Sequence, residues 1–282
     1  MITAMPRIAI ATPDFDGLVH TCRQHLGLPV IDLTDTHLPL LGARLAMCVP
    51  PGGSNIELMS PATPGAPLSQ SLQRFLDRRG PGLFALMLEA PDPDAEAALL
   101  AGRGLQVLPR MPAAEGRDLH PASTHGVLIR VYPVDSFQGR PAPGTPVGPL
   151  SGIQQVLLAV HDLDRAMHTW GHGLGLAVEA PVHDMQRGVT CATVRPPSGG
   201  SIALLAVHDA SRPFAAPIAA HLASRGEGLF ALELHAPDPL ALLPGWQAAG
   251  LDAAPAADAP GVVTIAPAAM AGARLRIAPA PA

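Results

Sequence analysis

The twelve histidines are the side chains of this sequence that exchange protons most readily near neutral pH. The reference pKa of histidine, about 6.5, suits a general acid or base. His120 and His125 flank a polar loop, and we predict His125 as an acid–base group. The alternative for a histidine that precedes a glycine in a loop is a surface or hydrogen-bonding role. His168, His172 and His221 fall on expected helices, where we predict structural roles.

Motifs of several common chemistries are missing. The chain contains no G-x-S-x-G nucleophile elbow, no phosphate-binding loop, no dinucleotide fingerprint and no His-Glu-x-x-His metal motif. Cys22, Cys48 and Cys191 are an odd number at unrelated spacings, which is typical of buried thiols in a reducing cytoplasm. We therefore predict a cytoplasmic protein that carries no cofactor.

Charge and hydropathy exclude two classes of partner. The net charge is −5 and the basic residues are scattered, so no nucleic-acid partner is expected. No apolar run is long enough to span a membrane, and the strand-like start of the chain shows no signal peptide. We expect a soluble protein whose partner is a small molecule.

An internal repeat organises the chain. The segment Gly80–Pro93 recurs as Gly226–Pro239 at an offset of 146, with the shared core Gly-Leu-Phe-Ala-Leu. Leu26-Gly-Leu28 likewise matches Leu174-Gly-Leu176 at an offset of 148. Matches at nearly constant offset indicate a tandem duplication of about half the chain.

The duplication predicts two domains, at 1–133 and 151–282. Residues 134–150 between them are rich in Pro and Gly and lack periodicity, as expected of a linker. A duplication can supply within one chain the contact that a dimer supplies between two. We expect a monomer, with a homodimer as the alternative.

Within each copy, a strand, a helix and further strands occur in order, twice. In the first copy we predict strands at 8–12, 28–33, 43–49, 55–59, 83–89, 105–108 and 126–132, and helices at 14–26, 68–78 and 92–102. Asp14 is placed to cap the first helix, and Pro93 stands in the first turn of the third. This order predicts an α+β fold of βαβββ units, although a ferredoxin-like sandwich fits the order as well.

Local motifs decide between these folds. The segments Ile56–Pro61, Phe75–Gly82 and His120–Ile129, in that order, resemble the methylmalonyl-CoA epimerase branch of the vicinal oxygen chelate superfamily. This superfamily also holds glyoxalase I, bleomycin-resistance proteins and extradiol dioxygenases. The resemblance covers nearly all of 5–133 and continues more weakly over 151–282. It implies two tandem glyoxalase-like domains, each of paired βαβββ modules that form an open β-cup.

The family places a divalent metal at the bottom of the cup, held by two histidines and two Glu or Gln residues. Carried over by motif, these positions read Arg7, Glu57, Phe84 or Ala85, and Arg130 in the first copy. In the second copy they read Gln155, Ala203, Phe230 or Ala231, and Arg276. Arginine offers no free lone pair to a cation, so we predict that neither cup binds a metal.

The arginines suggest what replaces the metal. Arg7 and Arg130 would project into one cup beside Glu57, and guanidinium groups suit carboxylate or phosphate ligands. The alternative is a salt-bridge network that fills an inactive cup. The second arginine exceeds the charge that Glu57 neutralises, which favours the anion site.

The resulting predictions name two kinds of residue. The ligand-binding candidates are Arg7, Arg130, Phe84, Gln155 and Arg276, and the catalytic candidates are Glu57 and His125. Asp184 in the second copy, and Asp35 and His37 in the first, are weaker candidates for the carboxylate base that the resembling epimerases carry in this neighbourhood.

Three functions fit these residues. The first is a metal-independent isomerase or lyase acting on a small carboxylate, acyl-thioester or oxo acid. The second is a non-catalytic binding or sequestering protein of the bleomycin-resistance type. The third is a degenerate scaffold without a ligand.

Overall fold

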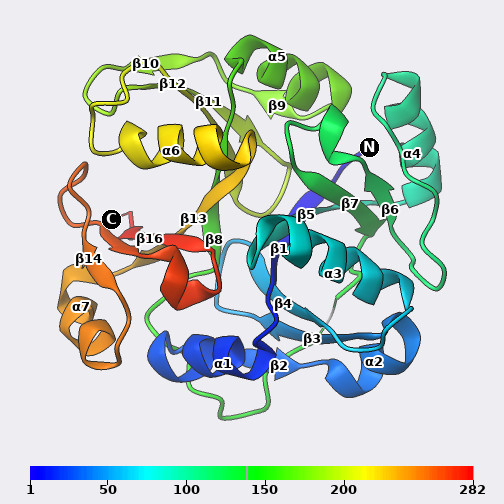
Figure 1. Ribbon diagram of the computed structural model, residues 1–282, viewed down its shortest axis with the longest axis horizontal. Coiled ribbons are helices and arrows are strands. Elements are labelled where there is room, and N and C mark those ends of the chain that lie inside the picture. Colours follow the sequence, from blue (N-terminus) through cyan, green and yellow to red (C-terminus); the bar gives the residue numbers. More distant parts are fainter. Residues whose placement is uncertain (138, 282) are drawn as a thin grey trace.

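The computed structural model describes residues 1–137 and 139–281, which form two α+β domains side by side (Figure 1). The strands of the first are β1 (Ala4–Ala11), β2 (Val30–Asp32), β3 (Ala43–Cys48), β4 (Asn55–Pro61), β5 (Gly82–Ala90), β6 (Arg117–Leu119) and β7 (Leu128–Pro133). Its helices are α1 (Phe15–His20), α2 (Thr34–Leu41), α3 (Pro67–Arg79) and α4 (Pro93–Gly102).

The second domain repeats this arrangement. Its strands are β8 (Ile153–Ala159), β9 (Ala177–Val178), β10 (Val182–Asp184), β11 (Val189–Arg195), β12 (Ser201–Val207), β13 (Gly228–Ala236), β14 (Ala253–Pro255), β15 (Val263–Ile265) and β16 (Arg274–Pro279). Its helices are α5 (Leu163–His168), α6 (Ala215–Arg225) and α7 (Pro239–Ala248). No helix or strand lies among the described residues between Pro133 and Ile153. The domain limits 1–133 and 151–282 stay our assignment.

Strand order confirms the paired βαβββ modules. The first sheet runs β2-β3-β4-β1-β5-β7-β6, and the second has β8 and β13 in the places of β1 and β5. In each sheet the two central strands are antiparallel, while β4 beside β1 and β7 beside β5 are parallel. Two modules therefore meet at β1–β5, and again at β8–β13, and each sheet stays open at its edges. A ferredoxin-like sandwich does not have this order.

Capping residues set the helix starts that the sequence predicts. The Asp14 side chain accepts from Gly17 N at 3.0 Å, and Asp92 Oδ1 accepts from Asp94 N and Ala95 N, each at 3.0 Å. Each bond satisfies a backbone donor that the first helical turn leaves free. The first helix then changes to one π-helical turn, Thr21–His25, before Gly27 reverses the chain at φ +67°.

Some local features differ from the sequence predictions, among them strand β6, which is not among the predicted strands. The predicted strand at 105–108 is absent, and only a single bridge joins Val107 to Leu119 there, because this stretch is the short return from α4. Helix α2 is not among the predicted elements, since its residues lack an apolar stripe and include Pro39. It begins where Asp32 Oδ1 accepts from Thr34 N at 2.9 Å, and Pro39 falls in its second half.

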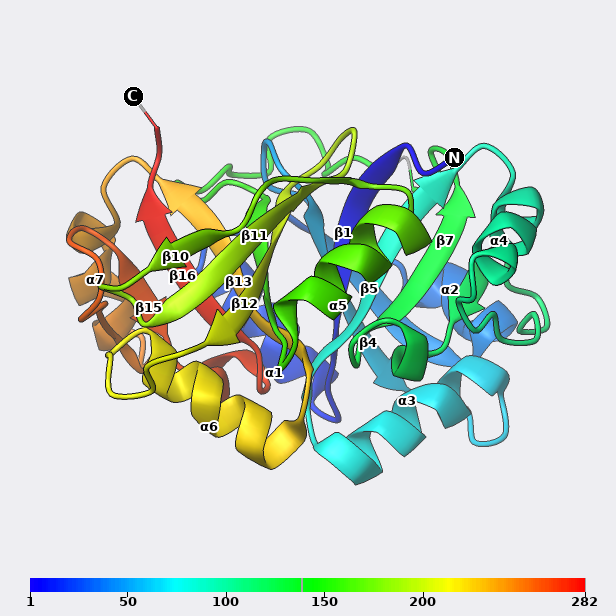
Figure 2. The same ribbon diagram turned by 90° about the horizontal axis from the view of Figure 1, so that it is seen from above.

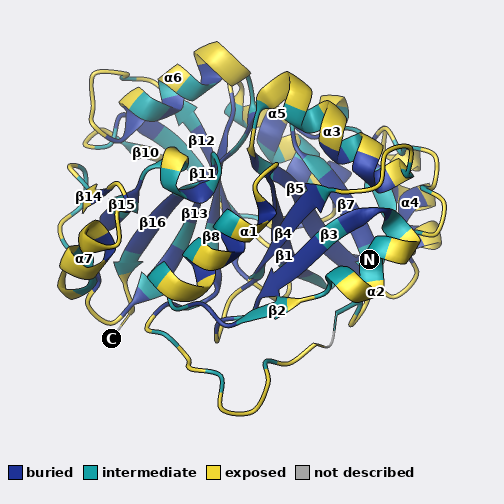
Figure 3. Cartoon of the chain, turned by 60° about the horizontal axis from the view of Figure 1, so that its bottom comes forward, coloured by how far each residue is buried: buried dark blue, intermediate teal, exposed yellow. Residues whose placement is uncertain are grey.

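The two faces of each sheet bury different side chains. Along β1, Ile8 and Ile10 face a large apolar core that is continuous with Val156 and Leu234 of the second domain. Ala9 faces the opposite side, which we call the cup face. Figure 3 shows the central strands of both sheets as mostly buried. The domains thus share one core, and the cup faces point away from it.

Helices α3 and α6 cover the two cup faces. Leu68 and Leu72 of α3 pack in the cluster of Ala9, and α6 buries Ile218 and Leu222 in the matching cluster of the second sheet. Figure 2 shows α3 and α6 side by side, on the same side of the molecule. Within the described ranges, no helix has the length and apolar character needed to cross a membrane.

Two related glycines mark one of the close contacts between the domains. A Cβ on Gly126 would lie 2.0 Å from the carbonyl oxygen of Glu227, and one on Gly272 would lie 2.0 Å from that of Pro81. Gly126 and Gly272 are equivalent in the repeat, and both have positive φ, +78° and +83°. Only glycine combines this backbone conformation with so close an approach.

The substitution Gly272→Ala tests this contact. Gly250 has nearly the same φ, +82°, but no atom of the described chain lies within 4 Å of the place of its Cβ. Gly250→Ala should therefore cost only the backbone term, about 1–2 kcal/mol in the free energy of unfolding. Gly272→Ala should cost at least about 3 kcal/mol, because a backbone carbonyl must also move. Urea unfolding of both variants measures the difference, and equal losses would refute the close crossing.

Candidate functional site

The first cup contains a buried ion pair. Arg7 Nε on β1 lies 3.2 Å from Glu57 Oε2 on β4, and Arg7 Nη1 donates to Ser136 Oγ at 3.0 Å. The guanidinium also lies over the ring of Tyr132, 4.6 Å from its centroid. The structure thus brings Arg7 and Glu57 together as the sequence predicts, but as partners of each other.

The second arginine of this cup has its own carboxylate. Arg130 Nε on β7 lies 3.3 Å from Asp118 Oδ1 on the neighbouring strand β6. Burial acts to lower the pKa of Arg130, but Asp118, Tyr132 and Glu57 outweigh it and raise the pKa. Burial also raises the pKa of Asp118, against the opposing charge of Arg130. The surroundings of Arg130 are therefore already anionic.

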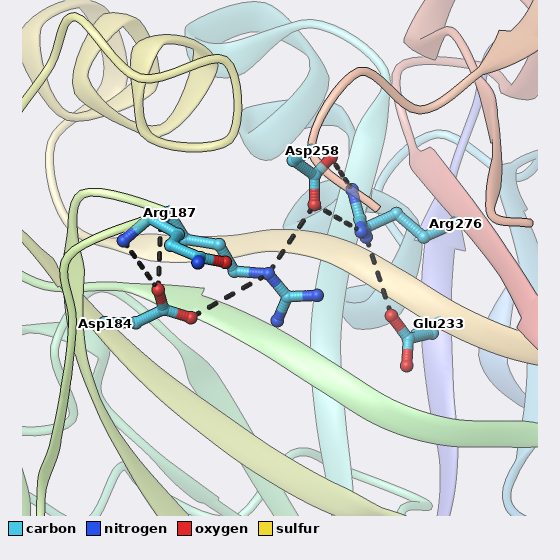
Figure 4. Close-up of polar contacts among 6 residues, drawn as sticks. Asp184, Arg187, Glu233, Asp258 and Arg276 are labelled. Atoms are coloured by element: carbon cyan, nitrogen blue, oxygen red, sulfur yellow. Dashed lines mark hydrogen bonds and ion pairs between the residues drawn. The ribbon is translucent and has the colours of Figure 1, made fainter. Parts of the chain in front are cut away.

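The second cup is neutralised in the same way, and more extensively (Figure 4). Arg276 on β16 donates to both carboxylate oxygens of Asp258, at 3.0 and 2.9 Å. Its Nε lies 3.5 Å from Glu233, and Arg187 Nε lies 3.7 Å from Asp258. Gln155 Nε2, on β8, donates to Ser201 Oγ at 3.2 Å. A bidentate pair of this geometry occupies the guanidinium face that a ligand would need.

The donor sets of both cups do not fit a divalent cation. At the family's ligand positions the first cup presents Arg7, Glu57 and Arg130, and the second presents Gln155 and Arg276. Among the described residues, no three His, Cys, Asp or Glu side chains gather closely enough to hold a metal. Guanidinium groups at these positions would repel a cation and have no lone pair with which to ligate it.

His125 lies at the contact between the domains and not inside the first cup. Its Nδ1 is 2.9 Å from Glu227 Oε2, and its Nε2 is 3.2 Å from Thr169 Oγ1. The residue is buried and has a φ of +53°. Both ring nitrogens thus contact side chains of the second domain, and this geometry suits a residue that holds the two domains together. A role for His125 or Glu57 in proton transfer stays a prediction.

The weaker base candidates have local structural roles. Asp184 Oδ1 accepts from the backbone of Gln186 and Arg187, at 3.0 and 2.9 Å, and so closes the turn after β10. His37 Nδ1 lies 3.1 Å from the carbonyl of Leu33, and Asp35 is exposed on α2. None of these bonds points to a ligand.

A large concave site lies elsewhere, between the two domains. A cavity of about 690 Å³ opens where α3 meets α6 and where β5, β7, β13 and β16 begin. Five arginines line it: Arg74, Arg78, Arg79, Arg225 and Arg274. No Asp or Glu occurs among the described residues of the lining, and none of the five arginines forms an ion pair with a described residue.

Hydrogen bonds between the domains hold two of these arginines. Arg79 Nη1 donates to the carbonyl of Arg225 at 3.1 Å, and Arg225 donates in turn to the carbonyl of Arg79. The two residues are equivalent in the repeat, so the contact is symmetric. Carbonyl oxygens satisfy these donors without cancelling their charge, so the cavity keeps a positive field.

His221 and Arg274 give the cavity its deeper polar groups. His221 Nε2 is buried and has no hydrogen-bond partner among the described residues. Burial, followed by the charges of Arg225, Arg79 and Arg274, lowers the pKa of His221 to about 4. Burial, and then Arg276, also lowers the pKa of Arg274. Both groups would therefore gain from an anion beside them.

Of the predicted site residues, only Phe84 reaches this cavity within the described chain, together with its repeat partner Phe230. Sequence reasoning assigns Phe84 to the wall of the cup and assigns His221 no function. The repeat contains a signal that could have pointed to His221 and Arg274 as site residues. At the offset of 146 they take the places of the apolar residues Phe75 and Leu128. Two polar replacements inside matching segments distinguish the copies, but only the fold shows that they meet.

Comparison with known proteins agrees with this architecture. Residues 7–122 match the glyoxalase/bleomycin resistance protein/dioxygenase superfamily. No protein of curated function matches the chain in sequence. A mutant of 4-hydroxymandelate synthase from Streptomyces coelicolor is 12% identical, with a TM-score of 0.67 over 98% of this chain and 92% of its own.

Two further solved structures are similar over only part of their own length or only part of this chain. A xylose isomerase-like TIM barrel/4-hydroxyphenylpyruvate dioxygenase fusion protein is 16% identical, with a TM-score of 0.63. The match covers 98% of this chain but only 48% of the fusion protein. Methylmalonyl-CoA epimerase from Mycobacterium tuberculosis is 26% identical over 47% of this chain and 91% of its own, with a TM-score of 0.40.

The fold is that of a protein with two tandem glyoxalase-like domains, as the sequence motifs predict. Residues 7–122 are similar to the glyoxalase/bleomycin resistance protein/dioxygenase superfamily. The resemblance seen in the sequence to this superfamily is thereby confirmed.

Substitutions of the first ion pair test whether it fills its cup. Glu57→Gln would leave a buried guanidinium without its carboxylate and should lower the free energy of unfolding by about 3 kcal/mol. The double variant Arg7→Met, Glu57→Leu should regain most of this loss, because neither charge of this pair is then left buried without its partner. Glu179→Gln, in the exposed pair with Arg195, is the control and should change stability by less than about 1 kcal/mol. A neutral Glu57→Gln would contradict the network.

His221 should make the protein less stable in mild acid. Its pKa is about 4 when folded and near 6.5 when unfolded, so the unfolded state binds more protons between these values. Its contribution is complete above pH 6.5 and is lost as the pH falls toward 4. His221→Phe, which copies Phe75, should remove about 1–2 kcal/mol of this pH dependence, a value reduced because the ring is only partly buried. Urea unfolding at pH 7 and 4.5 gives the comparison, and parallel profiles would contradict it.

Proposed function

We propose that this protein binds a small anionic molecule, without a metal ion, in the cavity between its two domains. The observation that carries the proposal is a set of five arginines around one concave site, none of them ion-paired within the described chain. Anions in such a site gain Coulomb energy from several cations, while no carboxylate of the described lining opposes them. The volume, about 690 Å³, lies within the range of small-molecule sites.

We place the ligand in this cavity rather than in either cup because of how the arginines are paired. Arg7, Arg130 and Arg276 each lie beside a carboxylate, at 3.2, 3.3 and 2.9 Å. An anion entering a cup would have to displace an internal partner and leave it buried and unpaired, which is costly. An anion entering the cavity has no carboxylate of the described lining to displace.

A second candidate is catalysis, as a metal-independent isomerase or lyase. The observation that favours it is His221, an uncharged imidazole at neutral pH that faces the same cavity as Arg274. Such a group can take a proton from a carbon next to a carbonyl. The electron pair then moves onto the carbonyl oxygen, where a guanidinium stabilises it. Binding alone needs none of this, so it remains the first candidate.

Anion titrations of three proteins test the proposal. Acetate and inorganic phosphate should raise the Tm of the wild type above that in chloride of equal ionic strength. Arg274→Leu, which copies Leu128, should weaken binding at least about tenfold in calorimetric titrations. Arg195→Leu removes a paired surface arginine on β11 and should bind like the wild type.

The location of the ligand is tested separately. The double variant Arg7→Met, Glu57→Leu should keep anion binding, since it alters only the first cup. Loss of binding in this variant, with binding kept in Arg274→Leu, would move the site into the cup. No stabilisation of the wild type by any anion would refute the proposal.

A further inference from the structure

The interdomain cavity is symmetric in its frame. Most lining residues of the first domain have a counterpart in the lining at the offset of 146, and several counterparts are identical. The identical pairs are Arg79 and Arg225, Leu83 and Leu229, Phe84 and Phe230, Pro121 and Pro267, and Gly126 and Gly272. An approximate twofold axis therefore passes through the cavity. The axis relates two ends of the cavity, one lined by the first domain and one by the second, whose backbones are similar.

The chemistry of the two ends is nevertheless different. At the first end, Phe75 packs edge-to-face on Phe84, with ring centroids 5.1 Å apart, and Leu128 stands at the start of β7. At the second end, His221 takes the same edge-to-face position on Phe230, at 5.6 Å. The backbone frame is thus kept, while the residue that packs on the phenylalanine changes from apolar Phe75 to polar His221. On the helices the charges lie on the other side, because Arg74 and Arg78 of α3 correspond to Ala220 and Ser224 of α6.

Arg274 completes the polar end. It replaces Leu128 and lies over the ring of Phe230, 5.4 Å from the centroid. Its cation and the buried Nε2 of His221, which has no partner in the described chain, line the same cavity. At the apolar end, Phe75, Phe84, Leu108 and Leu128 supply lining surface without a charged terminus.

From this division we infer that the ligand of the cavity is an amphipathic anion that carries one carboxylate or phosphate head group and an apolar tail. The inference rests on the proposed function and adds the class of ligand. The head group lies between Arg274 and His221. The tail crosses the twofold axis and packs on Phe75, Phe84 and Leu128. The exposed arginines of α3, Arg74 and Arg78, attract the anion at the mouth.

The orientation follows from the cost of the reverse arrangement. A head group at Leu128 would lose its water away from Arg274 and His221, with only the exposed arginines of α3 as cations on its side of the cavity. An apolar tail against Arg274 would bury a guanidinium unpaired. Both penalties vanish in the proposed orientation. The arrangement also explains why His221 and Arg274 stand in the second domain where the first domain has Phe75 and Leu128.

A homologous series of ligands tests the inference. The probes are acetate, butanoate, hexanoate and octanoate, with the matching alkyl phosphates, titrated calorimetrically at constant ionic strength. Each added methylene that packs on the apolar end should tighten binding about threefold to fourfold, which is about 0.8 kcal/mol. Phe75→His, which copies the polar end, should flatten this dependence on chain length. The carboxylate and phosphate arms show which head group binds more tightly.

Moving the charge tests the orientation. Arg274→Leu should weaken hexanoate binding at least about tenfold, and the double variant Arg274→Leu, Leu128→Arg should recover most of it, since the arginine then stands at the equivalent position. Circular dichroism and urea unfolding identify any variant that has lost its fold.

The outcomes separate the inference from the proposed function. If acetate and phosphate bind through Arg274 but affinity does not grow with chain length, the amphipathic ligand is refuted and anion binding stands. If short and long anions alike fail to bind, the proposed function itself is refuted. Equal loss of short-chain and long-chain binding in Phe75→His would also overturn the division into two ends.

Discussion

The close crossing of the domains at Gly126 and Gly272 is the constraint on which the rest of the structure depends. The backbones approach so closely there that only glycine fits, and the same crossing brings α3 and α6 side by side. Arg79 and Arg225 then reach each other's carbonyl groups. The cavity exists because two rigid domains meet along this line, and its lining comes from both. Neither domain alone contains the site.

The arginines of the two cups are paired with carboxylates, whereas those of the interdomain cavity are not. Inside the cups, Glu57, Asp118 and Asp258 approach the guanidinium groups, and each buried cation is neutralised within its own domain. At the interface, the arginines lie on helices and strand starts, and the described lining around them contains no carboxylate. Burial there lowers the pKa of both His221 and Arg274. The electrostatic need for an anion therefore lies between the domains.

The sequence predicts much of the fold, because local patterns determine it. Caps at Asp14 and Asp92, alternating apolar strands and the repeat offset lead to the right elements and, with the family motifs, to the right topology. Helix α2 is not predicted from the sequence because it has no apolar stripe, and its position depends on packing against β3. The candidate site is harder still. With Glu57 as the only carboxylate predicted in the first cup, Arg130 is left without a partner. Its partner is Asp118, which lies on the short strand β6, and the sequence shows no strand periodicity there.

A duplicated chain offers a physical route to such an asymmetric site. In a dimer of identical domains, every residue at the twofold axis appears twice, so an arginine at the place of Leu128 would bring a second one opposite it. Once the copies are joined, each side can change alone. His221 and Arg274 differ from Phe75 and Leu128, while the frame of Phe84 and Phe230 is the same in both copies. One end of the cavity can then hold a charge and the other an apolar group, an arrangement that strict twofold symmetry forbids.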